Sequence, residues 1–381
     1  MRPDREMPAS TAALSVREYA NVDDLPRDAW DQLARECRAL FFDSSLLAGI
    51  FHHNVEQVLA IRYFAVMDGD QLVAAAVAYA IRRSVWWSYY EERTGSPELF
   101  RGPWIAMPSV LTWSGDAPVR AGSDAAAIAA LLVARGRAFA REQDAVALVA
   151  TDVTRDAPLT APLRALADVA IQLDNNAVIS VQGSFEAYTA LLESGVRREF
   201  MRVRRRAEER GCRWSWYRPE DYPPGILDTL LALTNGVAVR HDNDVWYNLP
   251  LLTALATAPS ARLVMATAEG VPVAGFLVHE DATALYAQAG GWDAERKELS
   301  PFVNLVYEVV HKAHAWGKQA IEFGRTNYRF KRKHGCHFVP LYGLFYLTEL
   351  ADAGMRDRIV ALGRGLCDAI EHDGGDVAPL P

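Results

Sequence analysis

The sequence predicts an α+β protein of two similar halves, each with a mixed, mostly antiparallel sheet flanked by helices. The first observation is a repeated opening, because an acid-rich turn with a proline precedes a helical pattern in residues 23–38 and again in 220–236. The second is that a strand, an acid-Gly turn and another strand follow each opening, in residues 62–80 and 262–280. The third is that each half then supplies a helix and a strand. Repeats this far apart indicate duplicated domains rather than a solenoid.

These repeats divide the chain into three parts. Residues 1–175 are expected to form an N-terminal domain, and residues 176–350 a C-terminal domain whose start falls within the segment DNNAVIS. Residues 351–381 are expected to form a C-terminal helix and a flexible, Gly/Pro-rich tail.

Composition predicts a soluble, globular, cytoplasmic protein. Half of the 381 residues are apolar, yet the sequence holds no uncharged apolar run long enough to span a bilayer, and MRPDREMPAS lacks the apolar middle of a signal peptide. The four cysteines show no CxxC spacing, which suits free thiols in a reducing compartment. A net charge of -8 argues against a protein that coats nucleic acid, but local clusters of cations can still bind anions.

In the first half, the helix of residues 23–38 presents one apolar face. Its members are Ala29, Trp30, Leu33, Ala34 and Cys37. The aromatic run SVWWSYYE, residues 84–91, is expected to be the third strand with one face in the core, the alternatives being an acceptor pocket or a subunit contact. Ser123 then opens a helix over residues 124–143, and residues 145–153 form the following strand.

In the second half, an arginine-rich helix over residues 196–210 precedes the repeated opening. One stripe of it is apolar: Val196, Phe200, Val203 and Ala207. Residues 282–290 form the third strand. Ser300 and Pro301 begin a helix that Gly317 ends, and the strand of residues 319–323 follows.

Three segments within residues 184–346 resemble a known family. SFEAYTALLESGVRREFMRVRRRAEERG resembles its helix pair, and LYAQAGGWDAERKELSPFVNLVYEVVHKAHAWGKQAIEFGRT resembles its strand, long helix and "DFG"-type strand. YRFKRKHG resembles its "yxfKxxfG" segment, with Lys331 at the lysine position. By these motifs and their order, the sequence resembles tandem GNAT-type acyltransferases, in particular Fem-type aminoacyltransferases and related BioF2-like N-acyltransferases. The resemblance implies two tandem GNAT-like domains, the first degenerate and the second holding the donor site.

The sequence departs from related enzymes in two ways. The acetyl-CoA loop pattern Q/RxxGxG/A is only half matched, by Gln288 to Asp293, and the coiled-coil arm of some Fem enzymes is absent. Acetyl-CoA therefore does not follow as the donor from the resemblance alone.

Two clusters of cations in the second half predict a site for a phosphorylated carrier. One cluster follows the strand of residues 319–323 and includes Arg325 and Lys331; the other, on the arginine-rich helix, includes Arg202 and Arg206. Guanidinium groups bind phosphates bidentately, so these four residues are the expected carrier-binding residues. A solvated helix face is the alternative for the arginine-rich helix.

Amide formation needs an unprotonated amine and a group that takes its proton. Glu322 at a strand end, His241 beside two aspartates, and Tyr328 are the candidates for that role. Four further residues are expected to bind the acceptor: Gln288, Tyr286, Arg240 and Tyr342.

Other chemistries find no support in the sequence. The HGCH segment at residues 334–337 has a spacing too short for a usual zinc site, and Glu308, His311 and His314 lack a second helix of the same kind. We expect no metal ion and no permanently bound cofactor. The sequence has no P-loop and no GxGxxG after a strand, so a nucleotide-dependent ligase or dehydrogenase is not indicated.

The sequence therefore predicts an acyltransferase that moves an acyl or aminoacyl group from an activated carrier to an amine of a small molecule or peptide. An acyl-CoA or carrier-protein thioester is favoured as donor, because the chain is acidic and lacks an arm. An aminoacyl-tRNA, as in Fem-type enzymes of cell-wall or natural-product biosynthesis, is the alternative that the arginine-rich helix supports. A non-catalytic ligand-binding module is the third hypothesis. No membrane partner is expected, and no pattern indicates an oligomeric state.

Overall fold

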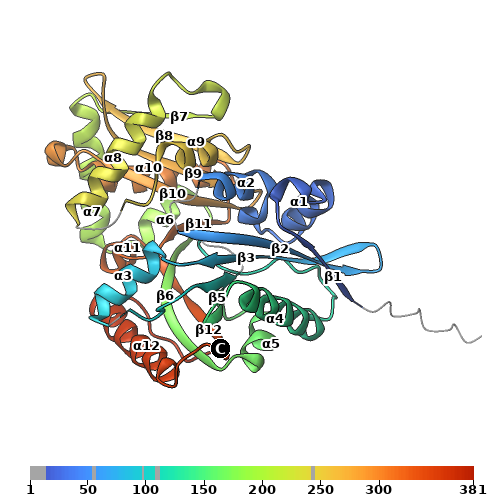
Figure 1. The fold of residues 1–381 in the computed structure, drawn as a ribbon. Coiled ribbons are helices and arrows are strands. Elements are labelled where there is room, and N and C mark those ends of the chain that lie inside the picture. Colours follow the sequence, from blue (N-terminus) through green and yellow to red (C-terminus); the bar gives the residue numbers. More distant parts are fainter. Residues whose placement is uncertain (1–13, 54–56, 97, 108–111, 242–244) are drawn as a thin grey trace, which may run out of the picture.

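The structure is a computed structural model that describes residues 14–53, 57–96, 98–107, 112–241 and 245–381. Within these residues, twelve strands form one continuous sheet in the order β1-β2-β3-β4-β5-β12-β6-β11-β10-β9-β8-β7 (Figure 1). The strands are β1 (Ser15–Tyr19), β2 (Val58–Asp68), β3 (Gln71–Ile81), β4 (Trp104–Met107), β5 (Ala147–Thr154), β6 (Val169–Ser180), β7 (Arg213–Tyr217), β8 (Ala261–Ala268), β9 (Val271–Glu280), β10 (Ala284–Trp292), β11 (Ala320–Gly324) and β12 (His337–Leu347).

The same strand pattern occurs twice along this sheet. An antiparallel meander, β1 to β4 in the first half and β7 to β10 in the second, is followed by one parallel neighbour, β5 or β11. The remaining neighbours are antiparallel. This arrangement confirms the predicted mixed, mostly antiparallel α+β fold.

Helices cover both faces of the sheet. They are α1 (Arg27–Glu36), α2 (Ser44–His53), α3 (Val85–Thr94), α4 (Ala125–Glu142), α5 (Thr160–Leu166), α6 (Phe185–Leu191), α7 (Ser194–Glu209), α8 (Ile226–Arg240), α9 (Leu249–Ala256), α10 (Pro301–Ala315), α11 (Tyr328–Lys333) and α12 (Met355–His372). Short 3-10 turns are η1 (Val22–Asp24), η2 (Leu40–Phe42), η3 (Pro219–Asp221) and η4 (Ala294–Leu299). Among the described helices, none has the length and apolar character needed to cross a membrane.

The cores on the two faces differ. On one face, a single core joins both halves, because α1, α2, α3, α8, α9 and α12 all bury apolar side chains in it. On the other face, each half has its own core, built on α4 and α5 in the first half and on α6, α7, α10 and α11 in the second. The shared core fixes the halves relative to one another, so side chains of both can line one site.

The C-terminal residues connect the halves further. Strand β12 returns from the second half and lies between β5 and β6, and α12 packs on β6 and α3. The segment after α12, predicted to be flexible, is hydrogen bonded: the carbonyl of Asp376 accepts from Gln172 at 2.8 Å and from Asn175 at 3.0 Å. The predicted division near residue 175 falls inside strand β6, and the domain limits stay a prediction.

The aromatic run of residues 84–91 is a helix, α3, and not the predicted strand. Its β-favouring residues are outweighed by packing: Trp87 and Tyr90, three residues apart, point together into the shared core. Gly95, with φ of 62°, ends the helix. In the sheet, β4 occupies the position next to β3 that was predicted for this run.

Two glycines of β10 serve close packing. A Cβ on Gly290 would lie 1.7 Å from the Phe276 ring, and one on Gly291 would lie 2.2 Å from the Leu233 carbonyl carbon in α8. These two glycines half-match a carrier-binding loop in the sequence. In the structure Gly290 makes room for the Phe276 ring of β9, and Gly291 lets helix α8 approach the strand.

We expect Gly291→Ala to destabilise the protein by about 3 kcal/mol, because the added methyl group would overlap rigid backbone. Gly195→Ala in the first turn of α7 is the control: a Cβ there meets nothing within 4 Å, so we expect a gain of up to about 1 kcal/mol from helix propensity. Urea unfolding measures both. Equal stabilities for the two variants would show that α8 and β10 do not need this contact.

Candidate functional site

The candidate site lies where the parallel strands β10 and β11 separate. The last paired residues are Tyr286 and Glu322. Beyond them β10 continues beside β9 alone, with a bulge between Ala287 and Ala289, whereas β11 reaches Gly324 beside β6. Bulges and separating strands interrupt the backbone ladder and often adjoin active sites. The opening faces the core that the two halves share.

Glu322 is held in this opening in a largely buried position. Its Oε2 accepts a hydrogen bond of 2.8 Å from the Asn176 amide on β6. The pKa of Glu322 is raised to about 7, chiefly by burial; the Asn176 hydrogen bond lowers it, and the charges of Asp281 and Asp116 add to the rise. A carboxyl with this pKa can both accept and release a proton near neutral pH.

Tyr286 lies beside Glu322 in the sheet register and opposite His279 of β9. Its hydroxyl donates to Asp281 Oδ2 at 2.9 Å. Burial and the negative charges of Glu322 and Asp281 raise the pKa of Tyr286, so the phenol stays neutral. His279 is fully buried, and burial lowers its pKa to about 4. Tyr286, the strand neighbour of Glu322, and His279 beyond it are thus neutral side chains.

A cleft of about 80 Å³ opens above Glu322 and Tyr286. Residues 38–42, before and within η2, form one wall, and residues 112–114 and Asp116 form another. Asp116 accepts hydrogen bonds from the Thr154 amide at 2.8 Å and hydroxyl at 2.7 Å, and burial raises its pKa. With carboxyl groups inside and one arginine, Arg38, the cleft suits an amine better than a phosphate.

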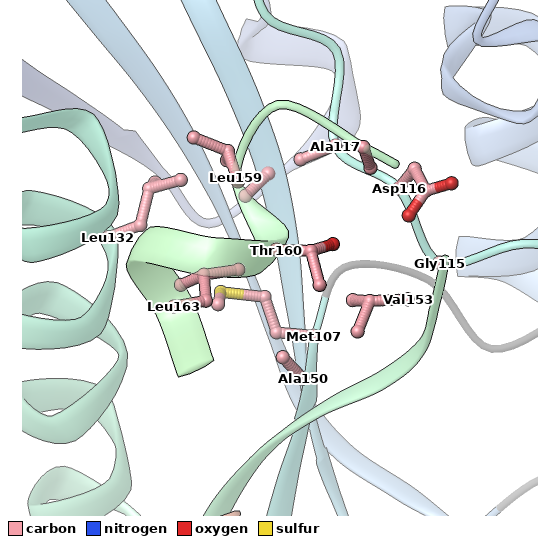
Figure 2. Close-up of a pocket in the computed structure, with 12 residues that line it drawn as sticks. Met107, Gly115, Asp116, Ala117, Leu132, Ala150, Val153, Leu159, Thr160 and Leu163 are labelled. Carbon is pink, nitrogen blue, oxygen red and sulfur yellow. The ribbon is translucent and has the colours of Figure 1, made fainter. Parts of the chain in front are cut away.

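Asp116 also borders a second hollow, in the first half, between β4, β5, α4 and α5 (Figure 2). Met107, Leu132, Val153 and Leu163 make its lining apolar. Its free volume is about 10 Å³, roughly enough for one water molecule and too small for an acyl chain. The cleft at Glu322 is therefore the better candidate for a substrate site.

Of the predicted site residues, the structure brings Glu322 and Tyr286 into one cleft. Gln288 is two residues further along β10, but its side chain is buried and donates to the Tyr247 hydroxyl at 3.3 Å, while its carbonyl accepts from the same hydroxyl at 3.0 Å. Gln288 does not line the cleft.

Arg325 and Lys331, predicted to bind a carrier, point into the protein instead. Arg325 forms an ion pair of 2.8 Å with Asp152 and lies 4.5 Å from the Trp86 ring centre. Lys331 donates to the carbonyl oxygens of residues 323, 324 and 325 at 2.9, 3.0 and 2.6 Å. Both side chains are buried. The carboxylate of Asp152 neutralises Arg325, whose Nε and Nη2 make no hydrogen bond among the described residues, and backbone carbonyls of the preceding turn accept from Lys331. Neither is placed to meet a phosphate at the surface.

Tyr328 is also fully buried, and its hydroxyl donates to Asp174 Oδ1. Burial and the charge of Asp174 raise its pKa well above the ordinary value, and it does not line the cleft. Tyr342, predicted to bind the acceptor, is buried on β12, where its hydroxyl donates to the Pro379 carbonyl at 2.9 Å. Tyr328 is thus hydrogen bonded in the protein interior, and Tyr342 is hydrogen bonded to the C-terminal segment.

The other predicted residues lie on the surface. Arg202 is exposed and pairs with Glu199 at 2.6 Å, and Arg206 is exposed on the same helix, α7. His241, which follows α8, is exposed, and Arg240 donates to the Trp292 carbonyl at 3.1 Å. The two predicted cation clusters therefore do not line a common cleft.

Sequence reasoning missed three residues around Glu322: Arg38, Asp116 and Asn176. Asn176 reaches the site only through strand register, which a single sequence does not give. Arg38 and Asp116 come from the first half. The available signal was the polar, glycine-containing loop WSGDAP, residues 113–118, which interrupts two apolar segments.

Within the part of the chain that the structure describes, no group of three or more His, Cys, Asp or Glu side chains is arranged to hold a metal ion. Cys336 and His334 are both buried, and burial raises the pKa of the Cys336 thiol to about 12. A thiolate is the nucleophilic form of cysteine, so this residue is unsuited to nucleophilic catalysis.

Comparisons with known proteins agree with this topology. Residues 194–332 match the family model described as an acetyltransferase (GNAT) domain, and this segment contains β10, α10, β11 and Glu322. The chain is a tandem GNAT-fold protein. This family-model match confirms the predicted resemblance and the predicted enzyme class, a GNAT-like N-acyltransferase or aminoacyltransferase.

Two solved structures share the fold over most of the chain. The crystal structure of FemX is 14% identical and has a TM-score of 0.59, covering 87% of this chain and 97% of that one. The structure of L-PGS from Bacillus licheniformis is 12% identical with a TM-score of 0.53, covering 84% of this chain and 95% of that one. At these identities the likeness establishes the tandem fold. No curated protein matches the sequence.

Proposed function

We propose that this tandem GNAT-fold protein transfers an acyl or aminoacyl group to an amine in the cleft at Glu322, with Glu322 as the general base. One observation carries the proposal: a mostly buried carboxyl with a pKa near 7 lies at the point where β10 and β11 separate, inside the GNAT-matched segment. A base whose pKa is near the working pH is partly ionised and still binds a proton firmly.

The chemical step needs no covalent enzyme intermediate. The amine nitrogen attacks the carbonyl carbon of the activated acyl group, forming the C–N bond. Glu322 takes the proton that the nitrogen loses. The carbonyl–sulfur or carbonyl–oxygen bond to the carrier then breaks, and the leaving thiolate or ribose oxygen receives a proton. Neutral Tyr286, hydrogen bonded to Asp281, borders Glu322 in the cleft.

For the donor we favour a thioester of coenzyme A or a carrier protein. The phosphates of such a carrier would meet the exposed arginines of α7, including Arg206, rather than the buried Arg325 and Lys331. Helix α7 packs against η4 and α10, and Arg210 donates to the Glu298 carbonyl at 3.2 Å, so this arginine-rich surface adjoins the helix that follows β10. The same exposed arginines favour aminoacyl-tRNA as the second candidate donor.

Product formation tests the proposal. Purified protein is incubated with a panel of acyl-CoA thioesters or a charged tRNA mixture, together with a panel of primary amines, and the products are searched by mass spectrometry for amides. We expect an amide that depends on protein and donor. Ribonuclease pretreatment abolishes the product only if tRNA is the carrier. Binding of thioester or tRNA without any amide across both panels would favour the non-catalytic ligand-binding module.

A further inference from the structure

We infer that the acceptor is an amino acid or a molecule ending in one: an amine and a carboxylate bound together in the Glu322 cleft. This inference rests on the proposed function, because it assigns the reacting amine to Glu322. It adds the second half of the acceptor, a carboxylate held by Arg38 with Thr112 and Trp113.

The cleft contains two kinds of polar group, carboxyl groups and hydrogen-bond donors. Glu322 and Asp116 supply carboxyl oxygens, which attract an amine or ammonium group. Arg38, Thr112 and Trp113 line the same cleft and carry hydrogen-bond donors. A ligand with only an amine would leave these donors without an acceptor, whereas an amino acid satisfies both sets.

The donors on this wall have no partner among the residues that the structure describes. Thr112 is 6% exposed, and its hydroxyl and the Trp113 indole nitrogen are buried without a hydrogen-bond partner among the described residues. Arg38 is exposed, and its guanidinium makes no ion pair with any residue that the structure describes. Buried donors are nearly always satisfied in folded proteins, so two unsatisfied ones in a cleft point to a ligand oxygen or a water molecule.

The backbone at Arg38 is a separate observation. Arg38 has φ of 56°, and the amide of Ala39 donates to the Ala34 carbonyl at 2.8 Å, which closes the end of α1. Glycine is the usual residue at this left-handed position because a side chain is disfavoured there. The sequence has an arginine instead, directly before the wall of the cleft, where its guanidinium can form paired hydrogen bonds with a carboxylate.

The cleft volume limits the acceptor to a small head group. About 80 Å³ holds roughly the amine, α-carbon and carboxylate of an amino acid, and the rest of the molecule extends into solvent. The inference therefore specifies this head group and leaves the side chain variable.

Binding of matched pairs tests the inference without requiring turnover. L-alanine and ethylamine, L-phenylalanine and phenethylamine, and L-lysine and cadaverine each differ by the carboxylate, and ligand-observed NMR titration measures their affinities. For at least one pair, we expect the amino acid to bind tenfold or more tightly than its amine. Arg38→Gly should abolish this preference, Arg38→Lys should retain part of it, and Thr112→Val should weaken it. Arg35→Ala, at an exposed arginine of helix α1 outside the cleft, should keep it.

The Arg38→Gly variant separates binding from folding, because glycine fits the left-handed backbone and should leave the melting temperature unchanged or raised. Equal affinity for amine and amino acid in every pair would overturn the inference. So would tighter binding of phosphoethanolamine than of all three amino acids, or an effect of Arg38→Gly on the KM of the donor alone. If amino acids bind with the expected preference but no amide forms, the proposed function fails and the binding assignment stands.

Discussion

Glu322→Gln is expected to lower kcat for amide formation about 100- to 1,000-fold, with a smaller change in the KM of the donor. Glutamine has nearly the same shape and can still accept the Asn176 hydrogen bond, but it cannot take a proton from the amine. Steady-state kinetics on whichever amide the protein forms gives the two parameters separately. Glu349→Gln, at an exposed position outside the cleft, is the matched control and should keep full activity.

The pH dependence gives a second readout of the same variant. A base must be ionised, so kcat/KM of the unchanged protein should fall as the pH drops through about 7, the pKa of Glu322. The residual kcat/KM of Glu322→Gln should not show this fall near pH 7. A profile that keeps this fall, or a variant with full activity, would remove Glu322 from the mechanism.

The free energy of unfolding of Glu322→Gln should rise, although its activity falls. The folded pKa of Glu322, about 7, is above the ordinary value of 4.5, so the folded state binds the proton more tightly than the unfolded state. The unchanged protein therefore loses stability as the pH rises from about 4.5 to 7, and has lost that contribution fully above 7. Glutamine is never ionised, so we expect Glu322→Gln to be more stable at pH 8 by about 2 kcal/mol, with little difference at pH 5. Urea unfolding at the two pH values measures this.

The fold was largely predictable because its signals are local. The hairpins at residues 62–80 and 262–280 and the helix after Pro301 are each recognisable from periodicity and turn residues within a short window. The aromatic run was misassigned because strand propensity and helical spacing compete within residues 84–91, and tertiary packing decides between them.

The site was only partly predictable because its charges are settled by distant partners. Glu322 stood out as an acid at the end of an apolar strand. Sequence could not show that Asp152 neutralises Arg325, or that the cations after β11 hold the chain's own C-terminal segment, as Arg332 does with Asp376 at 2.6 Å. A cluster of cations in sequence therefore predicted a carrier site, whereas in space Arg325, Lys331 and Arg332 face three different partners.

Lys331→Met is expected to destabilise the protein by about 4 kcal/mol. The Lys331 ammonium donates to three consecutive backbone carbonyls, and methionine fills a similar volume without any donor. Hydrogen bonds from a charged group are worth more than neutral ones, and the carbonyls would lose their common partner in a buried place. Lys333→Met, on an exposed position of the same short helix, should change stability by less than about 0.5 kcal/mol. Urea unfolding compares the two.

This prediction also separates the two interpretations of Lys331. If the lysine bound a carrier phosphate, Lys331→Met would fold normally and bind the donor weakly. If Lys331 holds the turn after β11, the variant loses stability, and the fraction that is folded at low temperature keeps its affinity for the donor.

The turn after β11 matters for the site, because Gly324 has φ of 67° and a Cβ there would lie 2.7 Å from the Trp113 ring, which lines the cleft. A turn released from Lys331 would no longer fix Trp113 and Glu322 against each other. The folded variant should therefore lose kcat as well, and unchanged stability with weaker donor binding would return Lys331 to the carrier site.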